Sequence, residues 1–142
     1  MSNQINFDEG FKTYELVNKD KKVLGVIAFN PSDVDITQRY KKVVEELEKM
    51  DFEVKKGNKT EDFIELIGQL NEIVYEKVNY LVNANVAETF FSIMGPFSLM
   101  PSGQYFVEYV MEVIGNIITQ ETGKRVKKMN KRIQKYTKKY HG

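Results

Sequence analysis

The chain has 142 residues, of which 42% are hydrophobic and 29% are charged, as is usual for one soluble globular domain. It has no cysteine, and its single histidine, His141, is the penultimate residue. The absence of cysteine excludes disulfides and cysteine-based zinc sites. A histidine this near the end of the chain is rarely ordered enough to be the base of a catalytic triad. We expect no enzyme activity, no cofactor and no metal. No apolar run approaches the ~20 residues that cross a bilayer, and the polar, acidic N-terminal residues do not resemble a secretory signal.

Residues 11–29 predict a β-hairpin. The segment from Phe11 to Val17 alternates apolar and polar residues, and residues 18–21 are typical of a turn. A second apolar run, from Val23 to Phe29, is rich in β-branched residues. A lone hairpin is marginally stable, so we expect it to pack on helices.

Helical spacing dominates from Pro31 onward. Ser32 is a predicted N-cap, with Asp33 and Asp35 in the first turn, and the apolar stripe of this helix ends near Gly57. A second helix is predicted from Thr60 to about residue 82, a short third over residues 86–94, and a last one from about residue 103. The prediction is a mainly α domain: a helical hairpin, a long C-terminal helix and the N-terminal β-hairpin.

Charge divides the chain into two parts. Residues 124–142 hold nine Lys or Arg and no Asp or Glu, whereas residues 1–123 hold 12 basic and 20 acidic side chains. The net charges are +9 and −8. We expect residues 1–123 to form one domain and residues 124–142 a basic extension, in which Val126, Met129 and Ile133 keep helical spacing. Such asymmetry usually concerns partners rather than folding.

Two segments are candidates for binding a partner protein. The first is the basic extension. It contacts phosphate or an acidic protein surface, or it is only a soluble helix end whose charge complements the dipole of its own helix. The apolar segment 90–100 is either a buried loop that closes the core or a surface covered by another protein. The candidate contact residues are Phe90, Phe91, Met94, Phe97, Leu99, Met100, Lys128, Arg132, Lys135, Tyr136, Lys138, Lys139 and Tyr140.

Two short motifs are distinctive. The first is Phe29-Asn30-Pro31 with Asp33, Val34 and Asp35, followed by Arg39-Tyr40; the second is the terminal run from Arg132 to His141. With the order of the predicted elements, they make the chain resemble the tail assembly chaperones of long-tailed (siphovirus-type) phages and prophages of Gram-positive bacteria.

The resemblance implies a non-enzymatic helical protein of the host bacterial cytoplasm that is absent from the mature virion. It further implies two partners: the tape measure protein, a long helical chain, and the tail tube subunits that the chaperone recruits during tail morphogenesis. The alternative is a small phage regulatory or nucleic-acid-binding protein that uses the basic tail. We expect no membrane partner. We do not expect nucleic acid either, because the rest of the chain is net acidic and no known nucleic-acid-binding module matches the sequence.

Overall fold

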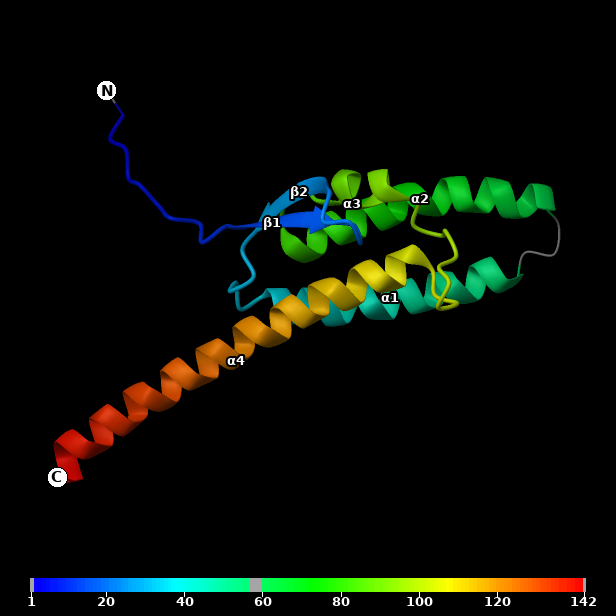
Figure 1. Ribbon diagram of the computed structural model, residues 1–142. Coiled ribbons are helices and arrows are strands. Elements are labelled where there is room, and N and C mark those ends of the chain that lie inside the picture. Colours follow the sequence, from blue (N-terminus) through cyan, green and yellow to red (C-terminus); the bar gives the residue numbers. More distant parts are fainter. Residues whose placement is uncertain (1, 57–59, 142) are drawn as a thin grey trace.

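The protein is mainly α-helical, with an N-terminal antiparallel β-hairpin and a long C-terminal helix (Figure 1). The computed structural model describes residues 2–56 and 60–141, and the side chains of residues 2–50 and 64–132. Its elements are β1 (Lys12–Val17), β2 (Val23–Phe29), α1 (Ile36–Lys56), α2 (Thr60–Val82), α3 (Ala87–Ile93) and α4 (Phe106–His141). The predicted fold class is confirmed.

The hairpin packs through one face, as its alternating sequence predicts. β1 and β2 pair in register from Lys12 opposite Phe29, with an irregularity between Leu16 and Val17. On the inner face, the rings of Tyr14 and Phe29 stack with centroids 5.4 Å apart, and Phe29 is fully buried. Gly25 allows close contact with α3, because a Cβ there would lie 2.5 Å from Cγ2 of Thr89.

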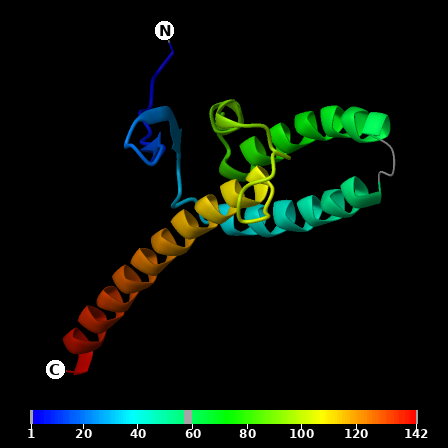
Figure 2. The ribbon, with the colours of Figure 1, turned by 45° about the vertical axis from the view of Figure 1, so that its right-hand side comes forward.

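α1 and α2 form an antiparallel helical hairpin, and α4 lies along α1 (Figures 1 and 2). Their apolar stripes meet in one core that includes the fully buried side chains of Val43, Val78 and Ile114. Asn79 of α2 fixes the start of α3, because its side-chain oxygen accepts hydrogen bonds from the backbone N–H groups of Val86 and Ala87, both at 2.8 Å.

The start of α1 differs from the prediction. The helix begins at Ile36 rather than after Ser32, so Asp33 and Asp35 precede its first turn. Asp33 accepts a hydrogen bond from the Asp35 backbone N–H at 3.0 Å and from Arg39 at 3.0 Å. The Ser32 hydroxyl does not cap α1, because it donates instead to the carboxylate of Glu121 on α4 at 3.1 Å.

α4 continues through the expected domain boundary at residue 123 without interruption. Its first half packs on the body, and its second half projects away from it (Figures 1 and 2). Gly123 lies inside the helix, and Lys124 and Arg125 immediately beyond it contact Glu121 and the Ser32 carbonyl oxygen. The basic extension is therefore the end of a core helix in this structure.

Candidate functional site

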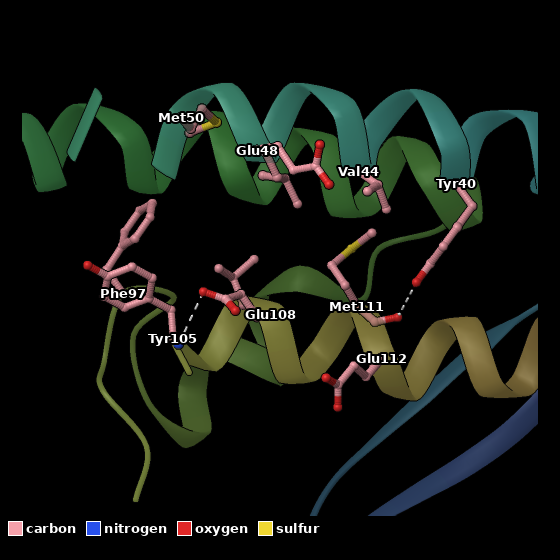
Figure 3. A pocket seen from close by; sticks show the side chains of 11 residues that line it. Tyr40, Val44, Glu48, Met50, Phe97, Tyr105, Glu108, Met111 and Glu112 are labelled. Atoms are coloured by element: carbon pink, nitrogen blue, oxygen red, sulfur yellow. Dashed lines mark hydrogen bonds between the residues drawn. The ribbon is translucent and has the colours of Figure 1, made fainter. Parts of the chain in front are cut away.

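An apolar groove runs between α1 and the first turns of α4 (Figure 3). It has a volume of about 290 Å³. Eight of its eleven lining residues are apolar or aromatic, and the other three are glutamates. The lining residues are Tyr40, Val44, Leu47, Glu48 and Met50 of α1, Phe97 and Tyr105 of the loop before α4, and Val107, Glu108, Met111 and Glu112 of α4.

The two helices present their groove residues at helical spacing. Tyr40, Val44 and Leu47 follow one face of α1, and Val107 and Met111 follow the facing side of α4. Val44 and Leu47 are only partly buried, although they pack against the core. Val107 and Met111 of α4 are buried beside them. A partly uncovered stripe on α1 that lies against a second helix is the kind of surface that receives a third helix.

Tyr40 closes one end of the groove. Its hydroxyl donates a hydrogen bond to the backbone carbonyl of Met111 at 3.0 Å (Figure 3). Gly115 makes this approach possible, because a Cβ there would lie 2.6 Å from the Tyr40 oxygen. Burial, with a smaller contribution from the charge of Glu112, raises the pKa of the Tyr40 hydroxyl. Tyr40 therefore remains a neutral donor that holds α1 against α4.

The loop between α3 and α4 forms the other end of the groove. It is fixed by backbone hydrogen bonds: the Phe106 N–H donates to the Ser98 carbonyl and the Val107 N–H to the Pro96 carbonyl, both at 2.8 Å. These bonds satisfy N–H groups in the first turn of α4. The loop also places the ring of Phe97 edge-on to that of Tyr105, with centroids 5.7 Å apart.

Glutamates border the groove on both helices. Glu48 lies on α1, and Glu108 and Glu112 lie one turn apart on α4; all three are exposed. Glu112 accepts a hydrogen bond from Nε2 of Gln104 at 2.6 Å, and Glu108 one from the Tyr105 backbone N–H at 3.5 Å. No Lys or Arg is among the lining residues described for this groove.

Outside the groove, Glu121 of α4 is the centre of a cluster of polar side chains near the β-hairpin. The Glu121 side chain is only 9% exposed, and it accepts hydrogen bonds from Nζ of Lys12 at 2.6 Å and from the Ser32 hydroxyl. Lys124 lies 3.4 Å from the same carboxylate, and Arg125 donates to the Ser32 carbonyl oxygen. The bond from Lys12 is the largest influence holding the pKa of Glu121 below its usual value.

The six predicted contact residues of the apolar segment separate into three groups. Phe90 and Phe91 of α3 are buried in the core, at 3% and 5% exposure, and so lie away from the surface. Met94 and Leu99 are exposed at 38% and 71%. Phe97 and Met100 are partly buried, and of these six only Phe97 lines the groove.

The predicted basic contacts all lie on α4. The side chains of Lys128 and Arg132 are exposed on its projecting half. Lys135, Tyr136, Lys138, Lys139 and Tyr140 belong to the same helix, but their side chains lie outside the described part. The projecting half starts more than three turns beyond Glu112, so the structure does not bring the basic residues and the groove together.

The residues of the Asp33–Tyr40 motif make structural contacts. Arg39 donates from Nε to the Leu81 carbonyl at 2.9 Å and pairs with Asp33, which ties the start of α1 to the end of α2. Tyr40 joins α1 to α4. The sequence did not predict the groove, because Val44 and Leu47 belong to the apolar stripe of α1 together with residues that are buried in the core.

No protein-family model, curated protein or solved structure matches this chain. Across the described residues, no three His, Asp or Glu side chains are grouped so that they could hold a metal ion. No helix in the described ranges is both long and apolar enough to span a membrane.

Proposed function

We propose that the protein is a non-enzymatic interaction protein whose α1–α4 groove binds an apolar face of a helical partner. The observation that supports this is the groove itself, in which apolar side chains of α1 and of the loop before α4 are only partly buried. At about 290 Å³ it lies at the lower limit of the ~300–1,000 Å³ typical of small-molecule sites. A few side chains of a docked helix suit it better than a whole metabolite.

The resemblance of the two short motifs to tail assembly chaperones suggests which helical partner the groove binds. The protein acts as a tail assembly chaperone in the bacterial host, binds the tape measure protein and recruits tail tube subunits. Before the tube encloses it, a tape measure exposes apolar helical stripes that tend to aggregate. A shallow groove masks one such stripe reversibly, and many weak contacts along a long chain give useful total affinity.

The test is capture of a tape measure protein of a long-tailed phage or prophage, by co-expression and co-purification. Leu47→Gln and Val44→Gln place amides in the groove at partly buried positions, and we expect both to reduce capture strongly. Ile73→Gln is the matched control, because Ile73 is 40% exposed on α2 and outside the groove. Unchanged capture by both groove variants, with all three proteins folded, would contradict the proposal.

The second candidate is a nucleic-acid-binding protein that uses the end of α4. The observation in its favour is that Lys127, Lys128, Lys131 and Arg132 are exposed on a helix that projects from the body. Such a helix can contact phosphates without obstruction. Tight DNA binding that weakens steeply with salt, together with no capture of the tape measure protein, would favour this candidate.

A further inference from the structure

The groove has a charge pattern that restricts its ligand. Glu48 approaches from α1 and Glu108 from α4, so one carboxylate stands on each side of the apolar floor, and Glu112 lines the groove with its carboxylate directed away from α1 (Figure 3). A ligand with acidic residues beside its apolar face would bring like charges together. A ligand with basic residues there would meet a complementary charge on each side.

The carboxylates on α4 keep their charge available. The donors to Glu108 and Glu112 are a backbone N–H and the Gln104 amide, both neutral. In the described part of the chain, neither residue pairs with Lys or Arg. Both are exposed, so a docked cation reaches them without displacing a Lys or Arg.

The basic end of the same chain does not fill this groove. α4 carries Glu108 and Glu112 near its start and the basic residues near its other end, and it runs between them as one helix. Only a second copy could place that end in the groove. Its described apolar positions are Val126 and Met129, a narrow stripe for a floor of eight apolar or aromatic residues. A separate partner with a wider apolar face fits better.

From this pattern we infer that the groove selects an amphipathic helix whose broad apolar face is bordered on both sides by Lys or Arg. The inference rests on the proposed function and names the chemistry of the partner segment. In a tape measure protein, it marks basic-bordered stripes as the docking sites and acidic-bordered stripes as poor ones. Steering by the carboxylates raises the rate of encounter more than it slows release.

The test uses two synthetic peptides of about 20 residues, long enough to form helix. Both carry the same Leu/Ala face, bordered by Lys in one and by Glu in the other, and binding to the intact protein is followed by fluorescence anisotropy. We expect the Lys-bordered peptide to bind and the Glu-bordered peptide to bind at least tenfold more weakly. Added salt should reduce this preference, because the carboxylates are exposed.

Charge-removing variants assign the preference to the groove. Glu48→Gln, Glu108→Gln and Glu112→Gln together should weaken the Lys-bordered peptide roughly five- to tenfold, as expected for three exposed pairs. The matched control removes three exposed glutamates outside the groove, Glu65→Gln, Glu72→Gln and Glu88→Gln, and should leave affinity within about twofold.

Each other outcome overturns the inference in a recognisable way. Equal binding of both peptides overturns the charge selection but leaves the groove as a docking site. Binding of neither peptide overturns both the inference and the proposed function of the groove. Concentration-dependent self-association of the intact protein in sedimentation, abolished by the triple groove variant, would make a second copy the occupant.

Discussion

The ammonium of Lys12 and the carboxylate of Glu121, 109 positions apart in the chain, meet at 2.6 Å. Lys12 begins β1, and Glu121 lies near the end of the packed first half of α4. Ser32, in the link between β2 and α1, donates to the other carboxylate oxygen. One acidic side chain therefore joins the hairpin, the link and the last helix.

Glu121→Ala should lower the free energy of unfolding by about 1–3 kcal/mol, because it removes a shielded acceptor from two donors. Glu121→Gln keeps the shape and should cost less. Glu88→Ala, at an exposed position on α3, is the control and should stay within about 0.5 kcal/mol of the wild type. Urea unfolding measures all three; equal stability of the Glu121 and Glu88 variants would mean that the bridge contributes nothing.

The carboxylate of Glu121 should also make the free energy of unfolding depend on pH. The bonds from Lys12 and Ser32 hold the pKa of Glu121 below its usual 4.5, and Arg39 holds that of Asp33 below 3.8. The unfolded chain then takes up these protons first, so stability is present above pH 4.5 and is lost as pH falls through the folded values. Glu121→Gln should flatten the loss of stability that sets in as the pH falls below 4.5 in unfolding experiments. Parallel curves for variant and wild type would contradict this assignment.

Tyr40 and Gly115 should be energetically coupled. Tyr40→Phe removes one hydrogen bond and should cost about 1 kcal/mol. Gly115→Ala places a methyl group 2.6 Å from the Tyr40 oxygen and should cost about 1–3 kcal/mol through overpacking. In the double variant that oxygen is absent, so the cost should be less than the sum of the two. A double-mutant cycle by thermal unfolding checks this, and strict additivity would show that the two side chains do not interact.

The two aromatic residues of the apolar segment should respond differently to truncation. Phe91 is 5% exposed and contacts both Tyr75 and Phe106, so Phe91→Ala should cost about 3–5 kcal/mol. Phe97 is partly buried at the groove, so Phe97→Ser should cost clearly less and should weaken partner capture. Melting temperature and co-purification separate the effects. A Phe97 variant as unstable as the Phe91 variant would make Phe97 a core residue.

Neutralising four exposed cations on α4 should leave the fold intact. The variant Lys127→Gln, Lys128→Gln, Lys131→Gln and Arg132→Gln removes repulsion between like charges, so its melting temperature should not fall. We expect weak binding of the wild type to duplex DNA and weaker binding of this variant. If all four residues contact phosphates, the slope of log affinity against log salt should become shallower by up to about 3.6. Unchanged DNA affinity would place any phosphate contacts elsewhere.

Much of the fold could be predicted from the sequence because apolar spacing changes from two to about 3.6 at Pro31. This change located β1, β2 and the four helices to within a few residues. The start of α1 was wrong because N-cap preference is local, whereas the Ser32 hydroxyl is taken by Glu121, 89 positions away. The residues next to Ser32 in the sequence give no indication of its contact with Glu121.

The groove could not be predicted for a different reason. Val44 and Leu47 belong to the same helical stripe as the fully buried Val43 and Ile36, and a stripe does not show whether a second layer covers each member. That depends on how α4 lies against α1, which Tyr40 and Gly115 set across 75 positions of sequence. The apolar segment posed the same problem, because Phe91 and Leu99 look alike in sequence but differ in exposure from 5% to 71%.

Because α4 is one uninterrupted helix, it fixes the distance between the groove and the cations at the end of the chain. At 1.5 Å per residue, the backbone rises about 28 Å from Glu112, at the groove, to Lys131, among the cations. A flexible linker would let those cations sample many positions, but a continuous helix holds them at one distance and in one direction from the groove. A partner that contacts both the groove and the cations must therefore carry two binding regions at that separation.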